Sequence, residues 1–456
     1  MTIDTHLKTV DLLPDLDRFW AISGQKINSL NENYDRVKGS PVFTVKGEYT
    51  TRGWTEWTQG FQYGSEILQF DATGDASYLE MGKKNTVYHM APHITHFGVH
   101  DHGFNNVSTY GNLLRLMNEG KIAENEWERN VYVMALKASS AVQAKRWTAL
   151  PAGGYIYSFN GPHSLFADTI RSLRALAIGH QLGHSIMEEN DQNISLLKRL
   201  VQHAQATAVF AVFYGEGRDT YDVWGRTAHE SIFNLNDGNY RCPNSQQGFS
   251  PFTTWTRGLA WIMLGAAEQL EFLQTIDDAE LEPLGGREAI EALLLKMAKA
   301  SNDFYIENTA ADGIPYWDTG APDLHKLGND VYSRESEPFN DAEPVDSSAA
   351  AIGVQGLIRL GRYLNAKDTG SGDRYIQAGL TTMKTLLSDK YLSLDESHQG
   401  LILHSVYHRP NGWDYIQEGH TVPCGESSMW GDYHAREAAL FIQRLANDET
   451  YYTFYL

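Results

Sequence analysis

The chain has 456 residues and carries 37 lysines and arginines against 57 aspartates and glutamates, a formal net charge of −20. Nucleic acid binding normally needs a basic surface, so this excess of negative charge argues against a nucleic-acid partner. The composition is 42% hydrophobic and 12% aromatic, which excludes disorder by composition and provides for a large core.

Apolar residues recur mostly at three- and four-residue spacing, over segments long enough to form helices. In chain order, this spacing predicts helices over 16–30, 57–70, 130–147, 165–182, 194–213, 256–273, 290–304 and 349–364. Segments with two-residue alternation are few and short, so a nearly all-α protein is expected. Short polar turns separate the helices, and none of them has the features of an interdomain linker.

Gly-Asp pairs occur between several predicted helices. In Gly74-Asp75 and Gly372-Asp373, the glycine is expected to end one helix and the aspartate to cap the next. This arrangement fits a chain of helical hairpins, although two occurrences do not establish a repeat. A further pair at 431–432 is expected to open the last helix, mainly as a structural turn.

Two regions, 214–253 and 312–346, depart from helical spacing and are rich in glycine, aspartate, asparagine and aromatic residues. Long irregular connections inside a compact domain are usually functional. We expect both regions to lie over one end of the helices and to build the mouth of a binding site.

Asp101 lies within a cluster of four histidines, His93, His96, His100 and His102. His96 and His100 are four residues apart and would share a helix face, as zinc ligands do. The cluster lacks the glutamate of the zinc-binding helix motif, and Pro92 and nearby glycines disfavour a continuous helix. Loop histidines that hydrogen-bond around Asp101, with no metal, are therefore expected.

Asp168 falls in the first turns of a strongly apolar predicted helix, which His163 or Ser164 would open. A carboxylate among apolar residues is costly unless it is paired, hydrogen-bonded or protonated. Two interpretations stay open at this point. Asp168 is either a functional acid or a carboxylate that complements the helix dipole, worth about 0.3–1 kcal/mol.

Arg257 and Trp261 are four residues apart on one predicted helix, and Trp255 stands at its start. An arginine beside indole rings suits a sugar that carries a carboxylate, because the guanidinium grips the anion while the rings stack on the sugar. The alternative is a pair of core tryptophans with a surface arginine. His229 and Gln247 precede this helix in the irregular region.

The motifs, taken in order, resemble the unsaturated glucuronyl hydrolases of glycoside hydrolase family 88 and, more distantly, the unsaturated rhamnogalacturonyl hydrolases of family 105. Each motif is weak alone, but seven in family order are a specific signal. The matches run from Trp57 to Tyr433 and are Trp57-Thr-Gln-Gly-Phe61, His100-Asp101-His-Gly-Phe104, the Asp168 helix, Gln247-Gly248 with Thr254-Trp-Thr-Arg-Gly-Leu-Ala-Trp261, Pro315-Tyr-Trp-Asp318, Asp346-Ser-Ser-Ala-Ala-Ala-Ile352 and Gly431-Asp-Tyr433.

This resemblance implies an all-α fold, an (α/α)6 barrel of six helical hairpins with a loop-built active-site mouth, formed by a single catalytic domain over 1–456. It implies that Asp168 is the general acid/base and Asp101 the second catalytic aspartate. It further implies a uronate subsite lined by Trp57, His229, Gln247, Trp255, Arg257 and Trp261. No cofactor and no metal are implied.

The activity implied by the resemblance is that of a glycoside hydrolase acting on unsaturated uronate-terminated oligosaccharides. Such an enzyme removes the 4,5-unsaturated uronic acid that polysaccharide lyases leave at the non-reducing end, by hydrating the C4=C5 vinyl ether. Asp168 is expected to be protonated, with its pKa raised by burial and by a nearby like charge, and Asp101 to be ionised and to orient water.

Departures from the family pattern concern mainly the leaving group. Leu259 replaces a common glutamine, and Gly225-Arg-Thr-Ala precedes His229 in place of the usual turn. One alternative is a hydrolase of saturated β-glucuronides with an inverting pair of carboxylates. Another is a sugar epimerase or lyase that uses the histidine cluster as bases. A carbohydrate-binding protein without activity would be favoured if Asp101 or Asp168 were missing.

Cysteine content and apolar segments indicate the compartment. Cys242 and Cys424 are the two cysteines, far apart, which excludes a disulfide scaffold. The first 17 residues carry acids and lack the apolar segment of a secretory signal, so a cytoplasmic location is expected. No stretch approaches the roughly 18–20 apolar residues of a membrane span, so no membrane partner is expected.

Overall fold

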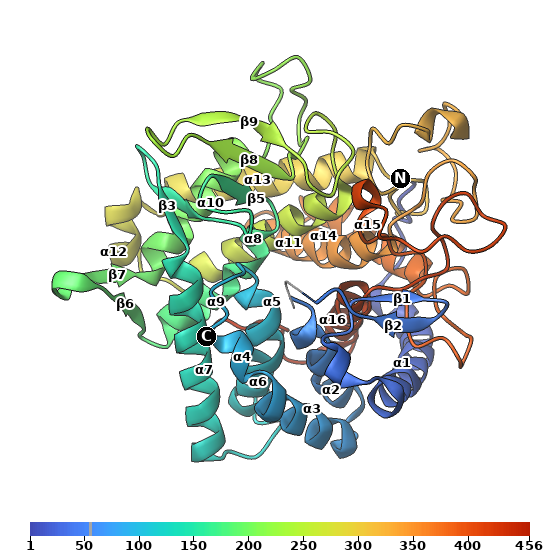
Figure 1. The fold of residues 1–456 in the computed structure, drawn as a ribbon, viewed down its shortest axis with the longest axis horizontal. Helices are drawn as coiled ribbons and strands as arrows, with labels where there is room; N and C mark the ends of the chain where they lie inside the picture. The colour runs from blue at the N-terminus through green and yellow to red at the C-terminus, as the bar shows by residue number, and fades with distance from the viewer. Residues whose placement is uncertain (54–56) are drawn as a thin grey trace.

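A computed structural model describes residues 1–53 and 57–456 of the chain (Figure 1). Its helices are α1 Leu13–Asn33, α2 Gln59–Thr73, α3 Ala76–His89, α4 Ala91–Ile94, α5 His102–Asn106, α6 Asn112–Asn118, α7 Glu126–Lys145, α8 Thr169–Ser172, α9 Arg174–Gln181, α10 Leu196–Phe210, α11 Thr256–Leu273, α12 Asp278–Leu281, α13 Arg287–Glu307, α14 Ser347–Lys367, α15 Asp373–Leu386 and α16 Met429–Ala446. A π-turn, Val107–Gly111, joins α5 to α6.

Short strands lie between the helices along the chain. They are β1 Phe43–Val45, β2 Glu48–Thr50, β3 Trp147–Ala149, β4 Gly154–Ile156, β5 Ser164–Phe166, β6 Ser185–Met187, β7 Asn193–Ser195, β8 Glu230–Phe233 and β9 Tyr240–Asn244. All pairings between them are antiparallel: β1 with β2, β3 with β4, β6 with β7, and β8 between β5 and β9.

Helices that follow one another along the chain pack as hairpins around a ring. α2 packs on α3, α5 and α6 on α7, α8 and α9 on α10, α11 on α13, and α14 on α15. The sixth hairpin joins the two ends of the chain, because α16 packs on α1 (Figure 1). The inner helices touch in the order α2, α5, α8, α11, α14 and α16, and α16 returns to α2. The described residues therefore close the (α/α)6 barrel that the family resemblance implied.

Residue composition explains which helices lie inside. α11 and α14 consist mostly of apolar or small residues and are buried along nearly their whole length, whereas α15 has one apolar face. The inner helices also bury charge among themselves. Arg171 lies 2.8 Å from Glu268 and 2.8 Å from Glu437, and Arg174 lies 3.3 Å from Glu437.

Seven of the eight predicted helices correspond to α1, α2, α7, α10, α11, α13 and α14. The helix predicted over 165–182 is wrong in its first part. Ser164, Leu165 and Phe166 form β5, which pairs with β8, and helix begins only at Thr169. Short apolar runs have no period that separates a buried strand from a buried helix, so spacing could not detect this strand.

The Gly-Asp pairs behave differently from one another. Gly74 ends α2 with φ +74°, and Asp75 caps α3 by accepting a hydrogen bond from the backbone N–H of Ser77 at 2.9 Å, as predicted. At the second pair, Gly372 is itself the N-cap and Asp373 is the first helical residue, so the predicted capping role is wrong. A flexible glycine satisfies that position without an aspartate before the helix.

The Gly-Asp pair at 431–432 lies inside α16, which begins two residues earlier with Ser428 as its N-cap. The predicted opening turn is therefore misplaced. Asp432 is structural, because its carboxylate accepts hydrogen bonds from the backbone N–H groups of Leu401 and Ile402 at 2.9 and 3.0 Å. Among the described residues, every helix is too short or too polar to traverse a bilayer.

Candidate active site

A cavity of about 200 Å³ opens at the N-terminal ends of the inner helices. Every predicted site residue except His229 lines it. The lining residues are Trp57, His100, Asp101, Phe159, Asn160, Phe166, Asp168, Gln246, Gln247, Trp255, Arg257, Trp261, Tyr407, His408, Asn411 and Trp413. Residues that were separate motifs in the sequence thus share one wall because the barrel brings the starts of its inner helices together.

Asp101 and Asp168 come together because α5 and α8 approach closely. A Cβ on Gly103 would lie 2.2 Å from the carbonyl oxygen of Ser172, so the contact requires glycine. The Ser172 hydroxyl accepts from the Gly103 N–H at 2.8 Å and donates to the carbonyl oxygen of His100 at 2.9 Å. These bonds hold the His100–Asp101 segment against the helix that follows Asp168.

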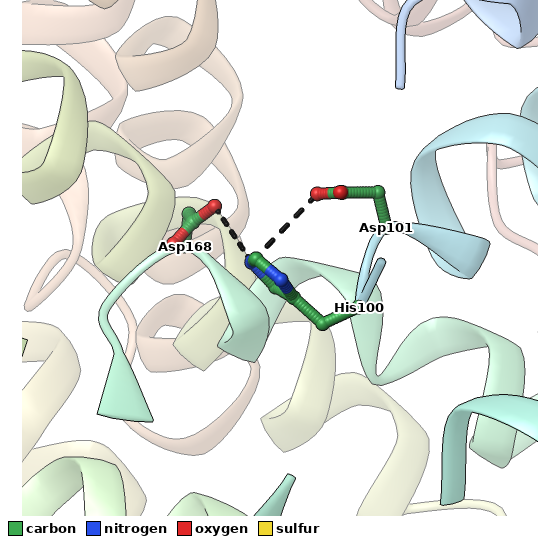
Figure 2. Close-up of side chains that lie close together, drawn as sticks. All are labelled: His100, Asp101 and Asp168. Carbon is green, nitrogen blue, oxygen red and sulfur yellow. Dashed lines mark hydrogen bonds and ion pairs between the residues drawn. The ribbon is translucent and has the colours of Figure 1, made fainter. Parts of the chain in front are cut away.

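His100 lies between the two carboxyl groups (Figure 2). Its Nε2 is 3.3 Å from Oδ2 of Asp168 and 3.8 Å from Oδ1 of Asp101. The three side chains are 1%, 13% and 6% exposed for His100, Asp168 and Asp101. The expected hydrogen bonds of loop histidines to Asp101 are not found for His100, whose ring lies near Asp101 but hydrogen-bonds to Asp168.

The two carboxyl groups have opposite pKa shifts. Burial raises the pKa of Asp101 to about 6, with a further increase from the charge of Asp168 and a decrease from His100. Burial acts in the same direction on Asp168, but the charge and the hydrogen bond of His100 outweigh it and hold that pKa below its usual value. The expected raised pKa of Asp168 is therefore wrong, because His100 keeps this carboxylate ionised, and the raised pKa belongs to Asp101.

Arg257 is held by the protein itself. Its Nη2 donates to Oε1 of Gln247 at 2.7 Å and to the carbonyl oxygen of Tyr407 at 2.8 Å. Its Nη1 donates to the carbonyl oxygen of Val406 and pairs with Asp346 at 3.3 Å. These groups occupy the ends of the guanidinium, so Arg257 helps to build the pocket wall. Its expected grip on a substrate carboxylate stays a prediction.

Two of the tryptophans that line the pocket, Trp255 and Trp261, are core residues, whereas Trp57 and Trp413 are partly buried. Trp255 and Trp261 are 3% and 2% exposed. The guanidinium of Arg257 is sandwiched between Trp255 and Trp430, 4.7 Å from each ring centroid, and Trp57 stacks on Trp430 at 4.9 Å. The alternative of core tryptophans is partly right, but the arginine beside them is buried and not on the surface.

His229 lies behind the wall. Its Nδ1 accepts hydrogen bonds from the backbone N–H groups of Gln246 and Gln247 at 3.0 and 3.2 Å, and its ring packs 4.5 Å from those of Phe166 and Trp255. Burial lowers the pKa of His229 to about 4, so the ring is neutral at pH 7. His229 therefore positions the Gln246–Gln247 segment, which corrects its expected place on the subsite surface.

The mouth is built partly from a segment that the sequence analysis missed. Tyr407, His408, Asn411 and Trp413 line the pocket, whereas no described residue of 312–346 does. The 312–346 region supports the wall from outside: Thr256 N–H donates to the carbonyl oxygen of Trp317 at 3.1 Å. The signal that would have found the missed segment is the concentration of histidine and aromatic residues over 404–413, outside any helical spacing.

The His100–Asp101–Asp168 cluster also bears on the expected absence of a metal. One nitrogen or oxygen atom from each residue lies within 4.8 Å of the others, a spacing that a metal ion would share. The same atoms form a hydrogen bond and ion pairs with one another. The absence of a metal or cofactor stays a prediction of the sequence.

Known proteins are similar to the chain in sequence and in structure. No protein-family model matches it. The unsaturated glucuronyl hydrolase of Bacillus sp. strain GL1 is 26% identical over 411 residues, covering 87% of this chain and 89% of that protein. The unsaturated glucuronyl hydrolase of Formosa agariphila is 25% identical over 399 residues, 84% and 79% of the two chains. The unsaturated chondroitin disaccharide hydrolase of Streptococcus pyogenes serotype M1 is 23% identical over 421 residues, 90% and 87%.

Solved structures share the fold. The unsaturated glucuronyl hydrolase of Bacillus sp. GL1 superposes with a TM-score of 0.69 at 24% identity, covering 95% of this chain and 97% of that one. The enzyme of the same name from Streptococcus agalactiae gives 0.70 at 20% identity, with 99% and 94% covered. The chain is therefore similar to the unsaturated glucuronyl hydrolases over nearly its whole length, as its motifs indicate.

Proposed function

We propose that the protein is a glycoside hydrolase that removes a 4,5-unsaturated uronic acid from the non-reducing end of lyase-generated oligosaccharides. The observation that carries this proposal is the placement of Asp101 and Asp168 on either side of His100, in a pocket walled by tryptophans. Relatives named for action on unsaturated glucuronyl and chondroitin oligosaccharides support it.

The reaction is a hydration of the sugar's double bond. In the unsaturated ring, C4=C5 and the ring oxygen form a vinyl ether, so a proton adds to C4 and positive charge develops at C5. Water then adds to C5, and the resulting hemiketal opens and expels the remaining saccharide. Asp168 delivers the proton and accepts one from the attacking water, which is general acid/base catalysis by one group.

Other groups of the pocket orient the substrate. The tryptophans provide an apolar surface for the sugar ring. Gln247 has its carbonyl oxygen bonded to Arg257, which leaves the amide N–H groups as the end of this side chain that can donate to a substrate oxygen. Asp101, 3.8 Å from His100, balances the charge of that ring and orients water. A cytoplasmic location and a single catalytic domain over 1–456 accompany this proposal as predictions of the sequence.

Asp168→Asn tests the proposal. We expect kcat to fall by roughly 10²–10⁴-fold, because the variant cannot carry the proton, while the substrate still binds. Turnover is followed as the loss of C4=C5 absorbance of unsaturated disaccharides from several uronate polysaccharides, and binding by calorimetry. Asp323→Asn, at an exposed pair with Lys326, is the control and should leave both unchanged.

Two outcomes would contradict the proposal. One is an Asp168→Asn variant that keeps more than about a tenth of the wild-type kcat, since loss of a general acid/base costs far more. The other is equal cleavage of a matched disaccharide with a saturated uronic acid, which would indicate displacement at the anomeric carbon instead of hydration.

A further inference from the structure

The proposed reaction needs a proton that the free protein does not keep on Asp168. His100 holds the pKa of this carboxyl below its usual value, so Asp168 is ionised at neutral pH. A carboxylate cannot protonate C4. The proton must therefore be held on a neighbouring group and reach Asp168 once the substrate has bound.

His100 is the group placed to hold it. Its Nε2 lies 3.3 Å from Oδ2 of Asp168 (Figure 2). The Asp168 side chain lines the pocket and is 13% exposed; its Oδ1 is buried, and Oδ2 is the oxygen that faces His100. The same oxygen can then accept a proton from His100 and deliver it to a sugar in the pocket.

The groups packed around His100 determine its charge. Burial and Arg146 act to lower the pKa of His100, but the two flanking carboxylates outweigh them and raise it above its ordinary value. His203 and His229 are also within electrostatic reach. Burial lowers their pKa values to about 3 and about 4, so both are neutral at pH 7 and add no charge.

The two ring nitrogens of His100 differ in their contacts, because Nε2 bonds to Asp168. Nδ1 is buried and has no hydrogen-bond partner among the described residues. The ring faces Phe166 at 5.6 Å and Phe159 at 6.2 Å between centroids. An imidazolium that depends on its carboxylate neighbours alone releases its proton when one of those neighbours gains proton affinity.

We propose that His100 stores the catalytic proton and passes it to Asp168 when the carboxylate of the uronic acid enters the pocket. This inference rests on the proposed function. Because the Asp168 side chain is more exposed to the pocket than that of His100, the new negative charge raises the proton affinity of Asp168 more than that of His100, and the proton moves from Nε2 to Oδ2. As the O–H bond breaks, the C4=C5 electron pair forms the C4–H bond. Water gives its oxygen to C5 and its proton to Asp168, which returns it to His100, so one water is consumed and the protein is unchanged.

The first test uses the unmodified protein. Loss of a proton from an imidazolium absorbs heat, whereas ionisation of a carboxyl group is nearly thermoneutral. The alkaline limb of the profile of kcat/KM against pH should therefore move to lower pH on warming, in buffers whose own pKa changes little with temperature. A limb that stays in place would assign the stored proton to a carboxyl group and overturn the inference.

The second test is His100→Gln, which keeps an N–H donor of similar reach but cannot store a proton. We expect kcat to fall by about 10²–10⁴-fold with KM changed by less than about threefold, and the temperature-dependent limb to disappear. His203→Gln is the matched control, a buried neutral histidine whose loss should preserve that limb. A His100→Gln variant with wild-type kcat would overturn the inference, and if the variant does not fold, the temperature test decides.

Failure of this inference is distinguishable from failure of the proposed function. If the wild-type protein consumes no unsaturated disaccharide, the proposed function is wrong before any variant is made. If it does consume one, but the alkaline limb of its kcat/KM profile does not shift with temperature, the proposed function is kept and His100 is not the residue that stores the proton.

Discussion

At the scale of single residues, Arg257 lines the pocket and also holds its wall together through hydrogen bonds. Its terminal nitrogens bond to Gln247 and to the carbonyl oxygens of Val406 and Tyr407, which belong to two separate segments that line the pocket. Two carbonyl groups and one amide therefore depend on a planar fork of donors, which lysine cannot reproduce.

Arg257→Lys should damage both stability and binding. The substitution keeps the positive charge but leaves buried carbonyl oxygens without donors, which costs about 1–3 kcal/mol per group. We expect a lower free energy of unfolding in urea and a KM raised by roughly tenfold as the mouth loosens, with a smaller change in kcat. Arg374→Lys, at an exposed pair with Asp303, should change neither. Unchanged stability in Arg257→Lys would show that the mouth does not depend on these bonds.

At the scale of secondary-structure elements, the geometry of the proposed catalytic pair, Asp101 and Asp168, depends on the contact between α5 and α8. Gly103 meets the backbone of Ser172 with no room for a side chain. Asp101 immediately precedes α5, and Asp168 immediately precedes α8. Any separation of the two helices therefore moves the two carboxyl groups apart.

Gly103→Ala should separate them. A Cβ placed 2.2 Å from the Ser172 carbonyl oxygen forces a backbone shift, at a cost of about 1–3 kcal/mol in stability. Misplacement of catalytic groups by about 1 Å can cost on the order of 100-fold in rate, so kcat should fall even in the folded fraction. Gly353→Ala is the control: its Cβ would meet its nearest atoms at 3.4 Å, an ordinary contact. Equal activity of the two variants would contradict the role of the α5–α8 contact.

The same contact shows what the sequence could and could not predict. Apolar spacing located the long helices because each inner helix buries a continuous run of residues. Strands such as β5 are three residues long and depend on a partner more than sixty residues away, so no local pattern marks them. The residue types of the site were also recognisable. Their roles were not, because the position of His100 between both carboxyl groups follows from helix packing.

At the scale of the whole molecule, the net charge of −20 acts on an anionic substrate. The long-range field disfavours its approach, while the buried guanidinium of Arg257 offers a local positive charge at the wall. Exposed charges are screened over about 10 Å at 0.1 M salt, whereas buried ones are screened much less. Added salt should therefore weaken the repulsion more than the local attraction.

The measurable consequence is that KM for an unsaturated disaccharide should fall as the concentration of sodium chloride rises, with kcat nearly constant. The control substrate is an uncharged methyl ester of the disaccharide, whose KM should not change with the sodium chloride concentration. A KM that rises with salt would show that local positive charge dominates substrate capture.

The ion-pair network between the inner helices should dominate the stability of the barrel. Glu437 of α16 pairs with Arg171 and Arg174 and accepts a hydrogen bond from Gln355 at 2.8 Å, all fully buried. Removing one partner of a buried pair leaves uncompensated charge and costs about 3–5 kcal/mol. Glu437→Gln should therefore unfold at much lower urea concentration at pH 7, whereas Asp323→Asn, at an exposed pair, should change the free energy of unfolding by less than about 0.5 kcal/mol.

The pH dependence of the unfolding free energy lost in Glu437→Gln shows whether charge or packing causes the loss. Although burial alone would raise it, the two arginines hold the pKa of Glu437 well below the usual value for glutamate. A depressed folded-state pKa contributes stability that is present above the unfolded-state pKa of about 4.3 and is lost as pH falls through the folded-state value. The difference in unfolding free energy between wild type and Glu437→Gln should thus be constant from neutral pH down to about 5 and shrink in stronger acid. If the difference stayed constant at low pH, packing at residue 437 would be its source, and the barrel would not depend on the charge of this carboxylate.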